Sequence, residues 1–214
     1  MQNVNDQLRA AARDGDAAQV KACLRDPKCD PWSNELGMTA LVWAAMGGHE
    51  ACLYLLLPVS DVLFKGREDW TALMWAAHGG HRSCVQLLLP MSKPLMEAKR
   101  GWTALMVAAT CGHASCVDLL LPVSDPVAKD GDGWTILMHA AKEGHASCVK
   151  LLLSVGDPLA KNNYEETASD LATQGGHTQL AILIDAYIVA ISERHELQAV
   201  AYRGAAVKSM SRRV

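Results

Sequence analysis

Five histidines recur at a constant interval of 32 residues, and this spacing constrains the fold more than any other feature. They are His49, His81, His113, His145 and His177. Two further columns keep the same register, one at Thr39, Thr71, Thr103, Thr135 and Thr167 and one at Cys52, Cys84, Cys116 and Cys148. A fixed period of this length indicates stacked supersecondary units, each in contact mainly with its neighbours. Such a stack presents an extended surface, so the pattern favours binding of a partner.

Residues 101–132 show one complete unit, GWTALMVAATCGHASCVDLLLPVSDPVAKDGD. The threonine is placed to cap a first helix, and the Ala-Ala pair supplies a closely packed face. A glycine follows where a left-handed residue ends a helix, at Gly48, Gly80, Gly112, Gly144 and Gly176. The next histidine begins a second helix, which we expect to stop at Pro58, Pro90 and Pro122. A turn containing Gly and Asp, here called the finger, leads to the following unit.

These residues resemble the ankyrin repeat, whose signature is a period of about 33 residues containing T-P-L-H-x-A. The corresponding run is T-A-L-M-x-A at 71–76 and 103–108, followed by A-x-x-G-H at 109–113. The resemblance covers residues 6–191 and implies an all-α solenoid of helix-turn-helix units with short finger turns or hairpins. Alanine replaces the family proline, Met or Val replaces the family histidine, and the period is one residue short. We expect a weaker hydrogen-bond link between units and a reshaped finger.

The register predicts six units in a single domain, residues 1–192. An N-terminal cap covers about 4–36, and four repeats cover about 37–68, 69–100, 101–132 and 133–164. A degenerate, more polar cap covers about 165–192, as the end of a stack requires. Residues 193–214 are interpreted as a helical extension that continues to about residue 201. A frayed tail then begins at Tyr202 and carries Lys208, Arg212 and Arg213. This tail is a solvated end, a contact with a membrane surface or a short address signal.

Charge and cysteine usage limit the classes of protein that fit. The formal charge is −3 and the pI about 6.2, without the basic excess of a nucleic-acid binder. Seven cysteines without a paired framework favour a reducing compartment. The N-terminus has no apolar signal core, and the longest apolar stretch, 180–191, contains Asp185 and is too short for a transmembrane segment. These observations predict a cytoplasmic protein, although the tail leaves export as an effector open.

No motif in the chain predicts catalysis, a metal or a cofactor. The four His-x-x-Cys pairs stand one unit apart, on the order of 10 Å, so four ligands do not meet around a zinc ion. We interpret the histidines as bonded to backbone near helix N-termini and the cysteines as core. The run at 130–133, DGDG, lacks the closing glutamate of a calcium loop and predicts a plain turn. We therefore expect no enzyme and no small-molecule substrate.

Aromatic side chains form two columns that the ankyrin resemblance places on or near the surface that grips partners. One column stands at the base of the fingers, at Trp70, Trp102 and Trp134. The other lies on the concave face, at Trp43, Trp75, Val107 and His139. An uncovered aromatic stripe marks a binding surface. The alternative is that these rings pack on the next unit and stabilise the stack. Positions that vary between units add His78, Met96, Arg100, Lys129 and Lys142 as candidate contacts.

The sequence thus predicts a protein–protein interaction module, an adaptor or inhibitor, that binds another protein through finger tips and concave helices. The surface changes from apolar near residues 43–106 to charged near 139–161. A partner with one apolar end and one polar or charged end fits this gradient. The alternative is a structural element that self-associates through its apolar end helix and has no dedicated external ligand.

Overall fold

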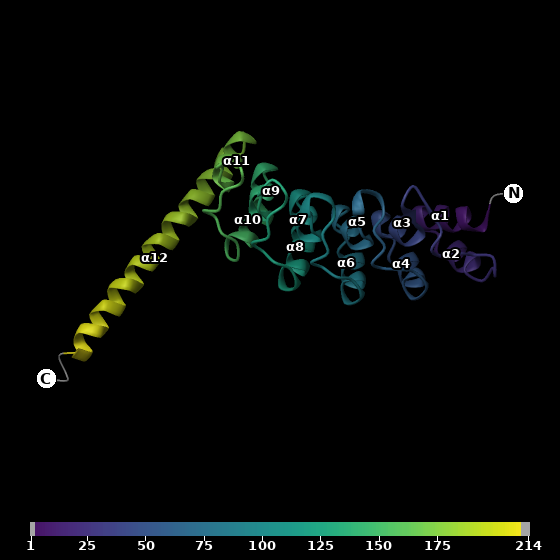
Figure 1. Ribbon diagram of the computed structural model, residues 1–214, viewed down its shortest axis with the longest axis horizontal. Coiled ribbons are helices and arrows are strands. Elements are labelled where there is room, and N and C mark those ends of the chain that lie inside the picture. The colour runs from purple at the N-terminus through teal and green to yellow at the C-terminus, as the bar shows by residue number, and fades with distance from the viewer. Residues whose placement is uncertain (1–2, 211–214) are drawn as a thin grey trace.

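Six helix pairs stand side by side in one row, which confirms the all-α solenoid of helix-turn-helix units (Figure 1). The computed structural model describes the backbone of residues 3–210. It describes their side chains as well, except those of residue 195 and of residues 197–210. The first helices of the units are called the inner helices, and the second helices are called the outer helices. In Figure 1 the inner helices line the upper side of the stack and most outer helices line the lower side.

Each helix pair consists of one inner and one outer helix. The inner helices are α1 (Val4–Asp14), α3 (Ala40–Gly47), α5 (Ala72–His78), α7 (Ala104–Thr110), α9 (Ile136–Lys142) and α11 (Ala168–Gln174). The outer helices are α2 (Ala17–Cys23), α4 (Glu50–Leu56), α6 (Arg82–Leu88), α8 (Ala114–Leu120), α10 (Ala146–Leu153) and α12 (Thr178–Met210).

Threonine begins five of the inner helices, as expected. Its hydroxyl oxygen accepts the backbone N–H of the residue three positions further on, at Thr39, Thr71, Thr103, Thr135 and Thr167. This contact satisfies one of the N–H groups that the first turn of a helix leaves without a partner. The caps therefore fix where each inner helix starts, and with it where each finger ends.

In the second to fifth units, a histidine joins the unit to the one before it. The Nε2–H of His49, His81, His113 and His145 donates to a carbonyl oxygen at the end of the preceding inner helix. The acceptors are Arg13 at 2.9 Å, Met46 at 3.0 Å, His78 at 2.9 Å and Thr110 at 2.9 Å. These histidines stand after the repeat glycine, not at the position of the family's T-P-L-H histidine. The repeated hydrogen bond between units is therefore made from a different position than that of the T-P-L-H histidine.

The hydrogen bond of each histidine also requires the glycine of the preceding unit. Gly80 has a φ of 70°, in the left-handed region that ends a helix and that side chains disfavour. A Cβ added at Gly80 would come within 2.4 Å of the His113 ring. Glycine thus lets the chain turn and leaves room for the histidine of the next unit.

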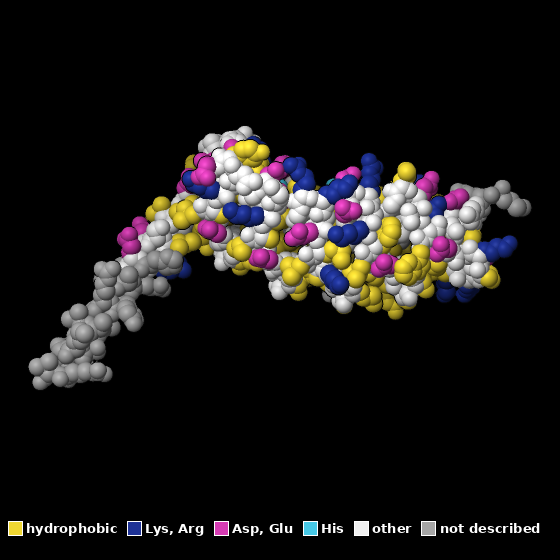
Figure 2. Space-filling model, in the orientation of Figure 1, with side chains coloured by type: hydrophobic (Ala, Val, Ile, Leu, Met, Phe, Trp, Pro, Cys, Tyr) yellow, Lys and Arg dark blue, Asp and Glu magenta, His cyan; other side chains and the backbone are white. Residues whose placement is uncertain are grey.

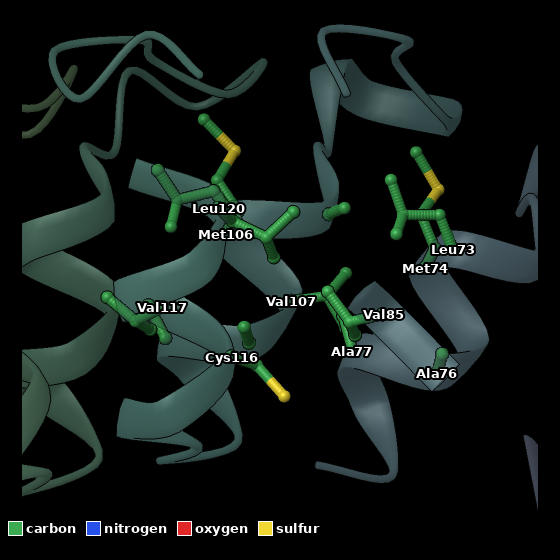
Figure 3. Packing of buried hydrophobic residues seen from close by; sticks show 14 of the residues in the cluster. Leu73, Met74, Ala76, Ala77, Val85, Met106, Val107, Cys116, Val117 and Leu120 are labelled. Carbon is green, nitrogen blue, oxygen red and sulfur yellow. The ribbon is translucent and has the colours of Figure 1, made fainter. Parts of the chain in front are cut away.

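The core runs through all six units and consists mainly of small and aliphatic side chains. Figure 3 shows Leu73 and Met74 of α5 and Met106 and Val107 of α7 among the packed residues. The cysteine column is buried, as predicted, with Cys52, Cys84, Cys116 and Cys148 each at most 1% exposed. Burial raises the pKa of the Cys84 and Cys148 thiols to about 11, so both stay protonated and unreactive near neutral pH.

The fingers differ in form from unit to unit. The first finger is a hairpin of β1 (Asn34–Glu35) and β2 (Met38–Thr39), in which Asn34 pairs with Thr39 and Glu35 with Met38. The next two contain 3-10 turns, η2 (Arg67–Asp69) and η4 (Lys99–Gly101). The fourth carries an isolated bridge between Lys129 and Thr135. Both expected forms, turn and hairpin, are therefore present.

As predicted, the outer α-helices α4, α6 and α8 stop just before the prolines. Each proline lies inside a further 3-10 turn that continues an outer helix, η1 (Leu57–Val59), η3 (Leu89–Met91) and η5 (Leu121–Val123). Proline suits this position because the first residues of a helical turn have no use for their N–H. The outer helices are therefore extended by one tight turn before the finger begins.

The last helix is longer than the sequence predicted. α12 continues to Met210, so the prediction of a frayed tail is wrong for residues 202–210. Arg212 and Arg213 lie outside the described residues. Its first turns pack on the stack, and the remainder projects from the end (Figure 1). Within residues 3–210 no helix combines the length and the hydropathy that a membrane crossing requires.

Removing one inter-unit hydrogen bond should destabilise the stack measurably. His113→Ala leaves the His78 carbonyl without its donor and opens space beside Gly80, so we expect a loss of about 1–3 kcal/mol in the free energy of unfolding. Urea unfolding followed by circular dichroism measures this change. The control, Gln86→Ala on an exposed face of α6, should change it by less than about 0.5 kcal/mol. Equal effects of the two variants would show that the histidine joint carries no stability.

Candidate partner-binding site

The tryptophan columns are more covered than an open aromatic stripe would be. Trp43, Trp70, Trp75, Trp102 and Trp134 are all partly buried and pack against the core. The Trp70 and Trp75 ring centroids lie 4.7 Å apart. Each ring therefore buries part of its surface in packing, and binding of a partner by the exposed remainder stays a prediction. The alternative, in which these rings stabilise the stack, accounts for the buried part.

His139 lies in the interior and not on the concave surface. It is 8% exposed, and its Nε2 is 2.9 Å from Oδ2 of Asp130. Its ring centroid lies 4.7 Å from that of Trp102 and 5.1 Å from that of Trp134. Asp130 also accepts the backbone N–H of Trp134 at 2.9 Å, which closes the finger. The prediction that His139 contacts a partner directly is therefore wrong. Its side chain instead supports the fourth finger through Asp130.

The charged candidates at the finger tips bridge neighbouring units. Arg100 pairs with Asp132 at 2.9 Å, and Nζ of Lys129 donates to the Lys161 carbonyl at 2.9 Å. On the inner helices Nζ of Lys142 donates to the Gln174 side chain at 3.4 Å. Exposed pairs of this kind contribute little stability. They do order the tips, so the surface that a partner meets is largely preformed.

Two other candidates remain at the surface without such a bridge. Met96 is half-buried in the third finger. His78 is exposed at the end of α5, and its ring centroid lies 5.6 Å from that of Trp70 and 5.9 Å from that of Trp75. His78 therefore extends the aromatic group of the second repeat out to solvent.

At the N-terminal end the structure gathers candidates around a cavity of about 320 Å³, the Trp75 cavity. It lies between the first two fingers and the inner helices α3 and α5, and it is mostly apolar. The lining residues are Glu35, Leu36, Met38, Trp43, Met46, Arg67 and Trp75. A second, more polar cavity of about 310 Å³ shares Glu35 and Trp43 and is otherwise lined by Asp6, Arg9, Ala10 and Arg13. An apolar and a charged compartment thus meet at one tryptophan.

Two polar groups of the Trp75 cavity lack a partner. The indole Nε1 of Trp75 is buried and makes no hydrogen bond. Leaving such a donor unpaired costs about 1–3 kcal/mol, so an acceptor that reached it would be favoured. The guanidinium of Arg67 is exposed and forms no ion pair with the rest of the described chain. Both groups favour a ligand that carries oxygen atoms beside its apolar surface.

The rim of the cavity holds a strained leucine. Leu36 is 87% exposed and has a φ of 55°, and the next residue, Gly37, has a φ of 77°. Positive φ at both central residues is the geometry of a tight type I′ hairpin turn, for which Asn-Gly is the favoured pair. A left-handed conformation costs a leucine roughly 1–2 kcal/mol. Glu68 and Arg100, in the same column, also have a positive φ, of 59° and 62°, so this conformation belongs to the finger turn. What distinguishes Leu36 is its exposed apolar side chain, which makes it a candidate contact.

The predicted site residues did not include Leu36, Met46 or Arg67. The pair Leu36-Gly37 carried a usable signal, because glycine after a central residue marks a tight turn. Met46 stands three positions after Trp43, which places the two side chains on one face of a helix. Trp32, 58% exposed in the first finger, was also missed. Around the other repeated polar residues, no three His, Cys, Asp or Glu side chains of the described chain come together as a metal site requires.

A family model described as ankyrin repeats, three copies, matches residues 8–94, 59–130, 91–165 and 122–190. The chain belongs to the ankyrin repeat family. A search of curated proteins found no match. Ankyrin repeats are generally protein–protein interaction modules. The overlapping matches include both fingers of the Trp75 cavity and the inner helices behind it, so the candidate site is part of the ankyrin domain.

The buried histidine makes this ankyrin domain sensitive to acid. Burial lowers the pKa of His139 from its ordinary value of 6.5, while the hydrogen bond and the charge of Asp130 oppose that shift. A histidine with a lowered folded-state pKa takes up its proton more readily in the unfolded chain. The stability that it contributes is therefore fully present above its unfolded pKa and is lost as the pH falls below it.

We expect the free energy of unfolding to fall between about pH 7.5 and about pH 5.5, roughly 1 pH unit either side of the ordinary histidine pKa, and to fall less in His139→Gln. Urea titrations of both proteins at the two pH values measure the difference. Other carboxylates and histidines act equally on both proteins, so the variant serves as its own control for them. The same loss in both proteins would show that His139 is not the group that titrates.

Proposed function

We propose that this ankyrin domain is an adaptor or inhibitor that holds a partner protein against its fingers and inner helices. The anchor is the Trp75 cavity. One observation carries the proposal: a mostly apolar cavity of about 320 Å³ lies beside an exposed, strained Leu36 and a buried indole N–H without a partner. The exposed leucine has no evident role in stacking the units, because its side chain is 87% exposed.

The cavity defines the chemistry of the partner segment. Its volume is at the lower end of small-ligand pockets, about 300–1,000 Å³, and suits one large apolar side chain with part of the adjoining backbone. Binding energy in protein interfaces concentrates on a few such anchors in desolvated pockets. A backbone carbonyl or a carboxylate next to that side chain can meet the exposed guanidinium of Arg67.

The remaining candidates extend the contact along the stack. Trp70, Trp102 and Trp134 offer their uncovered ring surface, and His78, Met96, Arg100, Lys129 and Lys142 add apolar and polar contacts. The finger tips are already tied to one another, so a partner orders little on binding, and more of the contact energy remains as affinity. A partner that is apolar at one end and polar or charged at the other fits this arrangement.

The setting that we propose is cytoplasmic, with a protein as the ligand. Support comes from the cysteine column, because Cys84 and Cys148 serve as core side chains with raised thiol pKa values and not as halves of a disulfide framework. The formal charge of −3 supports a protein ligand over nucleic acid.

A leucine substitution separates stability from binding. Leu36→Asn places a residue that tolerates the left-handed region at the hairpin tip, so we expect the free energy of unfolding to rise by about 1 kcal/mol. Capture of a partner from the native cell extract should fall at least about tenfold, the effect of losing about 1.4 kcal/mol of binding free energy. Urea unfolding and quantitative affinity capture measure the two effects on the full chain.

The matched control is Leu159→Asn, which makes the same chemical change at an exposed leucine of the fourth repeat. It should retain the partner. Undiminished capture by Leu36→Asn would move the anchor away from the Trp75 cavity. Capture of nothing by the unmodified chain would contradict the adaptor or inhibitor itself.

A further inference from the structure

The outer helices carry an apolar groove that the stack does not need. This outer groove has a volume of about 670 Å³ and lies over α2, α4 and α6. Its lining residues are Ala17, Ala18, Lys21, Glu50, Ala51, Tyr54, Leu55 and Leu87. Tyr54 is 69% exposed. Figure 2 shows hydrophobic side chains gathered along the lower edge of the stack over α4 and α6.

The repeat itself shows that this surface is special to the N-terminal units. The column of Tyr54 continues as Gln86, Asp118 and Lys150 in the later outer helices. The column of Ala51 continues as Ser83, Ser115 and Ser147. All of these later residues are exposed. Polar side chains therefore satisfy the fold at these positions, and the apolar ones in the first units have another use.

A second apolar surface without a partner lies at the opposite end of the chain. On α12 the exposed residues Ile182, Ala186, Val189 and Ala190 form what is called here the α12 stripe. Spacings of four, seven and eight residues put them on one face of the helix. Ile182 and Val189 are each 55% exposed, while Leu180, Ala181 and Ile184 are buried on the side that packs on the stack. Figure 2 shows hydrophobic side chains where α12 leaves the row.

The charges around the two surfaces are complementary. Lys21 lines the outer groove, and Arg25 follows one turn later on the same side of the chain. Asp185 and Glu193 flank the α12 stripe. All four are exposed and form no ion pair within the described residues. The groove also carries Glu50, and Arg194 is exposed further along α12, so charges of both signs have a counterpart.

We propose that the α12 stripe of one copy docks in the outer groove of a second copy, head to tail. Ile182 and Val189 lie against Tyr54, Leu55 and Leu87, and the acidic flank of α12 faces Lys21 and Arg25. The small side chains Ala17, Ala18 and Ala51 let the incoming helix approach closely. The contact leaves the fingers and inner helices free, so it goes beyond the proposed partner binding and does not compete with it.

The symmetry of this contact determines its consequence. Groove and stripe are different surfaces, so the interface is heterologous, and every dimer retains one free groove and one free stripe. Association therefore continues to longer chains as the concentration rises. The stripe spans about 12 Å of helix, from the rise of 1.5 Å per residue, which predicts a weak and concentration-dependent contact.

Single substitutions on the two surfaces test the proposal. Sedimentation velocity of the full chain should show a mass that rises with concentration above that of the 23.0 kDa monomer. Tyr54→Glu in the groove and Ile182→Glu on the stripe should each remain monomeric. A mixture of these two variants retains one intact groove and one intact stripe, so it should form a 1:1 dimer and stop there.

The controls keep these outcomes interpretable. Both substituted side chains are exposed, and circular dichroism verifies that the variants fold. Lys150→Glu, in the column of Tyr54 but on α10, should associate as the unmodified chain does. A dimer that persists in Tyr54→Glu alone would indicate helix-to-helix pairing, and one that persists in Ile182→Glu alone would indicate groove-to-groove pairing. Either result overturns the head-to-tail contact, as does a monomer at every concentration or a mixture that fails to dimerise.

Discussion

The hydrogen bonds from His49, His81, His113 and His145 to the preceding inner helix determine how the first five units pack on one another. Each forms only because a left-handed glycine leaves room for the ring, so the Gly-His pair acts as one joint. The joint also shapes the candidate site. The carbonyl of Met46 accepts from His81 at 3.0 Å, and the side chain of Met46 lines the Trp75 cavity. The spacing of α3 and α5, and hence the width of the cavity, therefore depends on the hydrogen bond from His81 to the Met46 carbonyl.

Repetition made the fold predictable from the sequence. A column that recurs in register reports the same environment several times, so the threonine caps, the left-handed glycines and the buried cysteines were all identified correctly. Features set by contacts that occur once were not. His139 is buried because Trp102, Trp134 and Asp130 surround it, and no other unit has a carboxylate in the column of Asp130. The extent of α12 is likewise outside the repeat, and the sequence predicted its end too early.

The candidate site was only partly predictable for the same reason. Trp43 and Trp75 stood out because they are aromatic residues in one column of the repeat, and both line the cavity. Leu36 and Arg67 lie in fingers whose conformation depends on a tight turn and on the neighbouring unit, which a period of 32 residues does not specify. The resemblance to ankyrin repeats predicted that a partner binds on the side of the fingers and inner helices. It did not give the end of the stack at which the apolar cavity forms.

The surfaces that distinguish the units lie on two sides of the stack. Leu36, Met46 and Arg67 on the finger side and Tyr54 on the outer side both belong to the N-terminal half, where the repeat departs most from its later copies. Binding of a partner on one side and association of copies on the other are physically compatible, since they use different helices. An assembly of copies through the outer groove would therefore present one Trp75 cavity for each copy of the chain.

Hydrogen exchange of the full chain, alone and in complex with the captured partner, shows directly where the partner binds. We expect slowed exchange on binding in β1, β2 and the first turn of α3, and in η2 with the start of α5, which surround the Trp75 cavity. Slowed exchange confined to the outer helices or to the fingers of the last two units would contradict this prediction.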